Sequence, residues 1–324
     1  MKINTVVADG LKLSRLVFES SHQRFKKAKA KFKCSDIPTL AVISTYSRAD
    51  SISYIKKEKK LFKEMGFKLE VVKIPRDCTA VELAHRIEYL NSLQGVHGIQ
   101  LHMPLPLDAI RHTKQLVNYI SPDKDVEGLT TLRNQQMLAS PYFKPLEDSD
   151  IIAPCTALAT LQVLNSYGVD CSDKRAIVLG SSFVTGCPIS AMLEKIGAKV
   201  TMCDRNTQNV PSLIKKADIL VSAVGKPDMF DLGLIKPGAV VLDLGFCDYG
   251  GRIRGDIDSE KLIGRASLIT PVPRGIGPIT SSMVVRNLIL LWEAHAKKQD
   301  QCSSIDDRPT QEGPSEGHRR LSAR

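Results

Sequence analysis

Two glycines six residues apart stand where an apolar strand pattern meets a helical one. The segment AIVLG leads into GSSFVTGCP, from Gly180 to Pro188, and helical spacing follows. The backbone N–H groups of such a turn, with a helix N-terminus behind them, can hold the pyrophosphate of a dinucleotide. Because the spacing is not G-x-G-x-x-G, the pattern by itself fits a plain structural turn equally well.

Two charged residues end the next strand pattern and could choose between dinucleotides. Asp204 could accept hydrogen bonds from the adenosine ribose hydroxyls, which favours NAD, whereas Arg205 could pair with the 2′-phosphate of NADP. The same pair also fits a polar turn at a strand end. Gly225 ends a further strand, where a small residue lets a cofactor lie against the backbone.

Alternating apolar and amphipathic segments predict the elements that position these residues. Strands are expected at 40–45, 68–74, 98–103, 176–179, 199–203, 219–222 and 239–244. Helices are expected at 51–65, 80–93, 108–120, 156–167 and 280–296. Such alternation implies mainly parallel sheets. We therefore predict the α/β class, with two α/β domains flanking a cleft and a Rossmann-type parallel sheet in the second.

The length of 324 residues suits two domains of ordinary size. We expect an N-terminal folate-binding or catalytic domain over residues 1–150, by the resemblance described below, and a Rossmann NAD(P)-binding domain over 151–280. A helix over 281–297 is expected to pack back on the first domain. Residues 298–324 offer almost nothing to bury, which predicts a disordered tail.

Composition excludes several classes of protein. Hydrophobic residues make up 43% and charged residues 25%, and no apolar run approaches the ~20 residues that a bilayer requires, so a membrane protein is not expected. The eight cysteines contain no C-x-x-C pair, which argues against a zinc site and a disulfide framework and favours a reducing compartment. No metal is predicted. No leader is evident, so we expect a cytoplasmic location.

The formal charge of +10 gathers largely in two runs, residues 24–33 and 56–63. Without an aromatic-lined groove or a nucleic-acid motif, these runs favour solvated helix faces over a nucleic-acid partner. The excess also suits an anionic small ligand, such as a dinucleotide or a polyglutamate tail.

Several segments together resemble the bifunctional methylenetetrahydrofolate dehydrogenase/cyclohydrolase family. They are S-x-x-Y at 51–54, MPLP at 103–106, PDKDVEGLT at 122–130, PCT at 154–156, G-S-S-x-V-x-G-x-P at 180–188, ADILVSAVGKP at 217–227, IKPGAVVLDLG at 235–245, GDID at 255–258 and TPVPRGIGPIT at 270–280. These segments occur in family order and span nearly the whole chain except the tail.

The resemblance implies a cleft in which the nicotinamide of NAD or NADP faces a tetrahydrofolate derivative, and a homodimer formed through the second domain. By the same resemblance, Tyr54 matches the tyrosine that stacks on the folate. Pro271, Pro273 and Gly277 match the loop that closes over substrate and nicotinamide. The cofactor-side positions are matched by Thr156, Gly180, Ser182, Gly225 and Thr280.

Departures from the family pattern gather around the same cleft. Glu58 stands where the family has a lysine, one helical turn after the tyrosine, that is tied to the cyclohydrolase step. An ionised carboxylate reverses the charge of that amine and cannot donate a proton. The others are His102 for glutamine, Glu127 for aspartate, Ser181 for an arginine that commonly meets the NADP phosphate, and Arg274 for glycine.

Two of these departures have more than one interpretation. Glu127 could still bind the pterin's amino and ring N–H groups as a bidentate acceptor. His102 fits either a hydrogen-bonded buried histidine or an acid/base group that compensates for the missing lysine.

Three functional hypotheses follow. The first is hydride transfer from methylenetetrahydrofolate to NAD or NADP, with cyclohydrolase activity weakened or absent. The second keeps both activities, with Lys57 or His102 replacing the missing amine. The third is a non-catalytic folate- or dinucleotide-binding protein that retains the fold.

Overall fold

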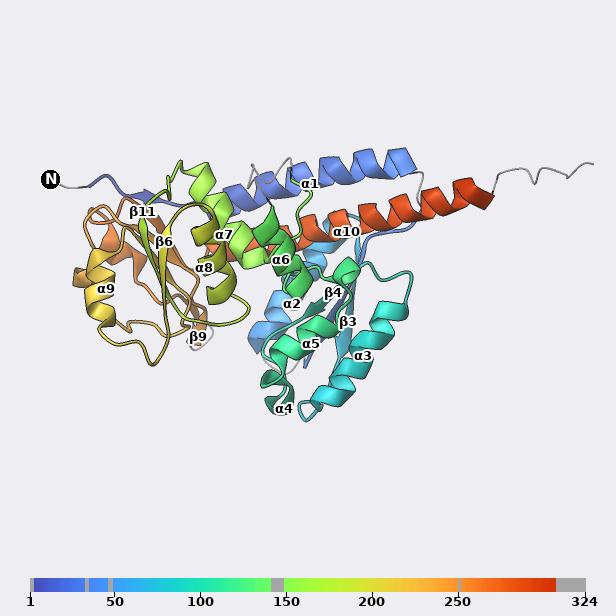
Figure 1. Cartoon of the computed structure of the whole chain (residues 1–324), viewed down its shortest axis with the longest axis horizontal. Helices are drawn as coiled ribbons and strands as arrows, with labels where there is room; N and C mark the ends of the chain where they lie inside the picture. Colours follow the sequence, from blue (N-terminus) through green and yellow to red (C-terminus); the bar gives the residue numbers. More distant parts are fainter. Residues whose placement is uncertain (1–2, 33–34, 46–48, 141–148, 250–251, 307–324) are drawn as a thin grey trace, which may run out of the picture.

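Two lobes lie side by side in the computed structural model of the chain, and a pair of long helices runs over the first lobe and reaches the second at one end (Figure 1). The structure describes residues 3–32, 35–45, 49–140, 149–249 and 252–306. Among these residues, no helix is long and apolar enough to cross a membrane.

The first lobe is built on a small parallel sheet with the strand order β3-β2-β4. Its elements are β2 (Thr39–Ser44), α2 (Ala49–Glu64), β3 (Lys68–Lys73), α3 (Ala80–Ser92), β4 (Gly98–Leu101), α4 (Leu107–Ile110), α5 (Thr113–Tyr119) and α6 (Thr131–Ala139). Every residue of β2 and β4 is buried, as expected for a parallel sheet that is covered on both faces.

The second lobe holds a six-stranded, all-parallel sheet with the order β1-β11-β8-β7-β5-β6. Its elements are β1 (Val6–Val7), α7 (Cys155–Ser166), β5 (Arg175–Leu179), α8 (Gly186–Lys195), β6 (Lys199–Cys203), α9 (Val210–Lys216), β7 (Ile219–Ser222), β8 (Val240–Asp243) and β11 (Leu268–Thr270). A two-stranded ribbon, β9 (Cys247–Tyr249) and β10 (Arg252–Arg254), stands apart. The predicted α/β class is confirmed, whereas the pairing of β1 with this sheet was not foreseen.

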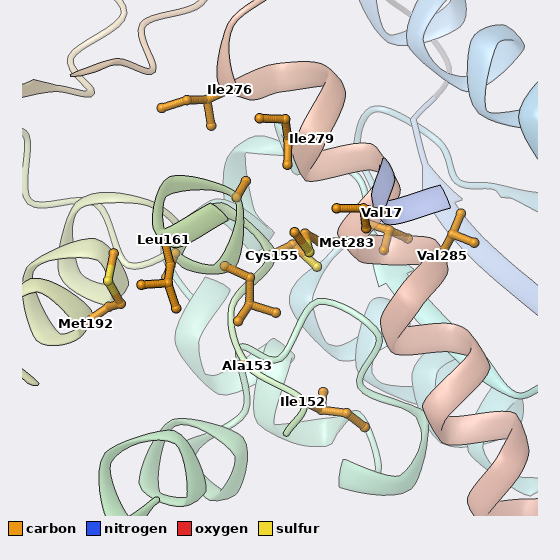
Figure 2. Packing of buried hydrophobic residues seen from close by; sticks show 14 of the residues in the cluster. Val17, Ile152, Ala153, Cys155, Leu161, Met192, Ile276, Ile279, Met283 and Val285 are labelled. Atoms are coloured by element: carbon orange, nitrogen blue, oxygen red, sulfur yellow. The ribbon is translucent and has the colours of Figure 1, made fainter. Parts of the chain in front are cut away.

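The two long helices join the lobes. α1 (Gly10–Phe32) and α10 (Ile276–Asp306) run alongside each other (Figure 1). Phe25 of α1 meets Trp292 of α10 edge to face, with ring centroids 5.0 Å apart. From α10, Ile279 and Met283 point toward Cys155 at the start of α7, inside the main hydrophobic core (Figure 2). One continuous core therefore extends across both lobes.

The structure corrects the expectation of a disordered segment from residue 298 onward. α10 continues to Asp306, because no helix-breaking residue occurs before Pro309. Residues 307–324 lie outside the described residues.

The helix expected at 108–120 is divided into α4 and α5. At the break, the Thr113 hydroxyl donates to the Ile110 carbonyl at 2.7 Å, a local bond that competes with the helical ladder. A short helix that the pattern did not predict, α6, is capped by Thr130, whose side chain accepts from the backbone N–H of Arg133.

Candidate active site

A cavity of about 200 Å³ lies where the carboxyl end of β4 faces the starts of α7, α8 and α10. Residues of the first lobe line one side of it, and residues near the second sheet line the other. The lining residues are Gln100, Leu101, His102, Met103, Glu127, Leu129, Cys155, Thr156, Val184, Thr185 and Thr280. The predicted residues His102, Glu127, Thr156 and Thr280 thus meet around one space.

The segment PDKDVEGLT, residues 122–130, positions Glu127 through hydrogen bonds on both sides of it. The buried carboxylate of Asp125 accepts hydrogen bonds from the backbone N–H groups of Gly128 at 2.9 Å and Thr130 at 2.7 Å. Gly128 has φ of +70°, and a Cβ there would lie 2.3 Å from the carbonyl carbon of Ala153. Only glycine fits this turn, and the turn directs the half-buried Glu127 side chain into the cavity.

The environment of Glu127 favours its neutral form. Burial, together with the charges of Asp125 and Glu58, raises the pKa of this carboxyl to about 8, against a hydrogen bond from Gln100 that lowers it. That bond runs from Gln100 Nε2 to Glu127 Oε1 at 3.4 Å. Gln100, which sequence reasoning missed, is buried and lies on the same face of the strand as His102, two residues on.

Glu58 lies on α2 and is 2% exposed. Its charge is one of those that raise the pKa of Glu127, so a residue of α2 influences a carboxyl group that lines the cavity. The Tyr54 backbone belongs to the same helix, but the side chains of Tyr54 and Lys57 lie outside the described residues. A carboxylate therefore occupies the helix position where the family pattern has an amine.

His102 is half-buried on the cavity wall, and its backbone N–H donates to the carbonyl of Ile43 at 2.9 Å. This bond fixes the backbone directly after β4. A half-buried ring on a cavity wall is compatible with either interpretation of this residue, as a structural histidine or as an acid/base group.

The glycine turn of the second lobe has no room for larger residues. Gly180 has φ of +109°, and a Cβ on Gly186 would lie 1.9 Å from the Gly180 carbonyl oxygen. Thr156 fastens the same loop to α7, because its hydroxyl donates to the Val184 carbonyl at 3.1 Å. The first N–H groups of α8 are engaged within the turn, because that of Gly186 donates to the Ser182 hydroxyl at 3.4 Å and that of Cys187 to the Ser182 carbonyl at 3.0 Å. The turn remains the predicted place of the dinucleotide pyrophosphate.

Gly225 ends the turn after β7 with φ of +72°, and a Cβ there would meet only the Phe246 carbonyl, at 3.5 Å. Sequence reasoning missed the residue that shapes this turn. The Asp256 carboxylate accepts from the Ser222 hydroxyl at 2.7 Å and from the backbone N–H groups of Val224 and Lys226 at 2.8 and 2.7 Å. The open side of Gly225 leaves room for a cofactor at the carboxyl ends of the strands.

Asp204 and Arg205 are both exposed at the end of β6. The Asp204 carboxylate accepts from the Thr207 hydroxyl and from the backbone N–H of Asn206, each at 2.9 Å. These contacts form a polar turn at the strand end, and they leave the choice between NAD and NADP open.

Sequence models of two protein domains match the chain. The catalytic domain of tetrahydrofolate dehydrogenase/cyclohydrolase matches residues 8–127, and the NAD(P)-binding domain of the same enzyme family matches residues 154–296. The chain belongs to the tetrahydrofolate dehydrogenase/cyclohydrolase family. The predicted resemblance is thereby confirmed, as is an NAD(P)-binding domain in the second half of the chain.

Individual members of the family agree with this assignment. The chain is 36% identical over 254 residues to the bifunctional protein FolD of Clostridium tetani. The matched region covers 78% of this chain and 87% of that protein. It is 34% identical over 291 residues to the cytoplasmic C-1-tetrahydrofolate synthase of Drosophila melanogaster, covering 86% of this chain but only 29% of that protein's length. The structure of the Trypanosoma brucei dehydrogenase-cyclohydrolase (FolD), complexed with NADP cofactor and inhibitor, matches with a TM-score of 0.79 and 28% identity, covering 90% of this chain and 98% of that one.

One departure from the family pattern places a non-glycine residue in an unfavourable backbone conformation. Arg274 has φ of +84°, in the left-handed region that favours glycine, the residue the family pattern has there. The Arg274 carbonyl accepts from the N–H of Gly10 at 3.0 Å, and a Cβ on Gly10 would lie 1.7 Å from the Gly275 carbonyl oxygen. The start of α1 therefore presses closely on the loop after β11.

The remaining predicted residues lie around the cavity but are not among those that line it. Pro271 and Pro273 belong to the loop after β11, and Gly277 lies in the first turn of α10. On the glycine turn, Ser181 and Ser182 are exposed beside Gly180. The structure thus brings together two predicted folate-side residues, His102 and Glu127, and two predicted cofactor-side residues, Thr156 and Thr280. The other predicted residues stand on neighbouring loops and helices.

Proposed function

We propose that this protein is a methylenetetrahydrofolate dehydrogenase that transfers a hydride to NAD or NADP, with cyclohydrolase activity weakened or absent. The observation that carries the proposal is the cavity between the lobes, because it joins Glu127 and His102 to Thr156 and Thr280. Family membership supplies the substrate class. The Trypanosoma brucei relative is a methylenetetrahydrofolate dehydrogenase-cyclohydrolase in complex with NADP, which supports the dehydrogenase part of the proposal.

Hydride transfer depends mainly on placement. A bound nicotinamide supplies the hydride acceptor. In the ionised form, Glu127 accepts two N–H groups of the pterin and fixes its orientation. Thr156 holds the glycine loop, and Asp256 holds the Gly225 turn, so both walls of the cofactor site are rigid. None of these roles needs a lysine.

The substitution at Glu58 bears on the two steps differently. Loss of hydride leaves a positive charge on the substrate, and a nearby carboxylate stabilises that cation. Hydrolysis of the same cation needs water attack and then protonation of the departing nitrogen, and an ionised carboxylate cannot donate that proton. Stabilising the cation as a ground state also raises the barrier to its hydrolysis. A carboxyl in place of the amine at Glu58 therefore bears on the hydrolysis step, whereas hydride transfer does not need the amine.

A fully bifunctional enzyme is the second candidate, and the position of His102 on the cavity wall supports it. An imidazole can shuttle protons near neutral pH and so could replace the missing amine. A silent folate- or dinucleotide-binding protein is the third, and the several departures around one cleft support it.

The test is a pair of assays on the purified full chain. Methylenetetrahydrofolate is added with NAD and with NADP separately, and the absorbance of the reduced cofactor is followed. Hydrolysis of methenyltetrahydrofolate is measured in parallel. We expect reduction with at least one cofactor, hydrolysis at the buffer rate, and a gain of hydrolysis in Glu58→Lys. Wild-type hydrolysis above the buffer rate favours the bifunctional enzyme, and absence of cofactor reduction favours the silent protein.

We further propose a homodimer, a cytoplasmic location, and the domain division at residue 150. The dimer is supported by β6, which ends the sheet order and exposes 42% of Met202 at an unpaired edge. The location is supported by the name of the Drosophila relative. Light scattering of the purified protein tests the first proposal, and fractionation of cells tests the second.

A further inference from the structure

Three potential metal ligands meet at the end of the first sheet opposite the cavity. They are Asp36, before β2, His97, directly before β4, and His295 on α10. One ligand atom from each residue lies within 4.8 Å of the other two. Because His97 precedes β4 and His102 follows it, this cluster is separated from the candidate active site by the length of the strand.

The ring nitrogens of the two histidines are differently engaged. His97 is 3% exposed, and its Nε2 has no hydrogen-bond partner among the described residues. Nε2 of His295 contacts the side-chain amide of Gln299 at 2.9 Å. The rings stand edge to face, with centroids 5.1 Å apart and an interplanar angle of 84°. A buried polar atom without a partner calls for a ligand or a water molecule.

We propose that Asp36, His97 and His295 bind a divalent transition-metal ion, with Zn²⁺ as the best match. Two imidazole nitrogens and one carboxylate form a ligand set that zinc uses in proteins, with a fourth position open to water or a ligand. Both histidines also line a hollow of about 600 Å³, which gives an ion a path from solvent. This site is separate from the proposed dehydrogenase reaction and does not depend on it.

The charges around the cluster are mixed, because the carboxylate of Asp36 is opposed by the ammonium groups of Lys124 and Lys298. Nearby Lys124 does not compete for the carboxylate of Asp36, because its ammonium donates to the carbonyls of Leu90, Asn91 and Leu93 at 3.1, 2.7 and 2.6 Å.

Two features limit the expected affinity. With bonds of about 2.0–2.2 Å, a tetrahedral zinc ion sets its ligand atoms about 3.3 Å apart, so separations of up to 4.8 Å must close by up to about 1.5 Å. Asp36 and His295 are half-buried and can move. Nδ1 of His97 accepts a hydrogen bond from the Thr39 N–H at 3.3 Å, and a metal on Nε2 requires a proton on Nδ1 instead. We therefore expect micromolar rather than nanomolar binding.

A bound ion would join three segments that are distant in the sequence. Through His295, His97 and Asp36, it would link α10 to the amino end of β4 and to the segment between α1 and β2. Binding to the folded state alone stabilises it by RT ln(1 + [metal]/Kd). The ion thus has a structural role in keeping the long helix against the first lobe.

Titration calorimetry of the metal-free full chain with ZnCl₂ tests the proposal. We expect one saturable site in the wild-type protein, and at least tenfold weaker binding in His295→Ala and in Asp36→Asn. Both substitutions are at half-buried positions, so folding should survive, and circular dichroism checks this. His85→Ala, an exposed histidine on α3, is the matched control and should bind as the wild type does.

Thermal unfolding supplies a second readout. Added Zn²⁺ should raise the midpoint of the wild type and of His85→Ala, but not that of His295→Ala. Equal binding and equal midpoint shifts in the wild type and His295→Ala would overturn the proposal, as would the absence of any saturable site.

Discussion

Gln100 donates a hydrogen bond through Nε2 to Oε1 of Glu127, and it joins a strand of the first sheet to the carboxyl group that faces the cavity. The bond favours the ionised form of Glu127, the form that can accept two pterin N–H groups. Gln100 is thus a positioning residue, since it acts on the substrate through Glu127.

Replacing Gln100 with leucine should weaken folate binding more than it weakens the fold. Without the donor, the pKa of Glu127 rises further, and less of the carboxyl is ionised at neutral pH. We expect the KM for methylenetetrahydrofolate to rise about tenfold, equivalent to about 1.4 kcal/mol, with kcat little changed. Steady-state kinetics measure this, and a proportional loss of kcat would contradict the positioning role.

The raised pKa of Glu127 predicts a specific pH dependence of stability. Its folded-state pKa of about 8 lies above the ordinary carboxyl value, so the folded state binds the proton more tightly than the unfolded state. This contribution is fully present below about pH 4.5 and is lost as the pH rises through about 8. The free energy of unfolding should therefore fall less over this window in Glu127→Gln than in the wild type.

Urea unfolding at several pH values tests this prediction. Asp243 and His97 also have shifted pKa values, about 6 and about 4, so the difference between variant and wild type isolates Glu127. Parallel curves for the two proteins would show that Glu127 titrates normally.

Gly186→Ala should remove dinucleotide binding, because the new Cβ would lie 1.9 Å from the Gly180 carbonyl oxygen. The backbone must move, and the loop that receives the pyrophosphate moves with it. We expect at least a tenfold loss of NAD(P) affinity, measured by quenching of protein fluorescence or by calorimetry. In the control variant Gly95→Ala, a Cβ meets nothing within 4 Å, and affinity should be unchanged.

Asn287→Ala should destabilise the whole molecule. The buried side-chain amide donates to the carbonyls of Val126 at 3.0 Å and Ala153 at 3.2 Å, and so joins α10 to the residue before Glu127 and to the segment that leads into α7. Removing it leaves buried carbonyl groups without this donor, at a cost of about 1–3 kcal/mol. Urea unfolding measures the loss. Asn206→Ala, at an exposed strand end, should change stability by less than about 0.5 kcal/mol.

Most strands of the two larger sheets were predictable because each is a short, largely apolar run between turn residues. The segment 199–203 and the segment 219–222 begin and end where the pattern places them. Helix ends were less predictable. α1 extends back to Gly10, far before the basic run, because its apolar residues Leu13 and Val17 find their partners only in the folded core.

The site was predictable where the chemistry follows local sequence, and it was missed where it depends on distant contacts. Gln100 could have been found, since it alternates with His102 on a buried strand and shares its face. The carboxylate of Asp256 could not, because its partners Ser222 and Val224 belong to another strand and its turn. The cluster of Asp36, His97 and His295 escaped for the same reason, since only the packing of α10 brings its members together.

The pairing of β1 with β11 has a consequence for synthesis on the ribosome. Val6 pairs with Leu268 and Val7 with Ile269, so the first strand waits for a partner made some 260 residues later. At about 5–20 residues per second, that delay is roughly 13 to 52 seconds. Throughout it, the apolar face of α1 has no α10 to cover it and is open to chaperones. The amino-terminal lobe cannot be finished before the carboxyl-terminal one, and the last helix to emerge completes both.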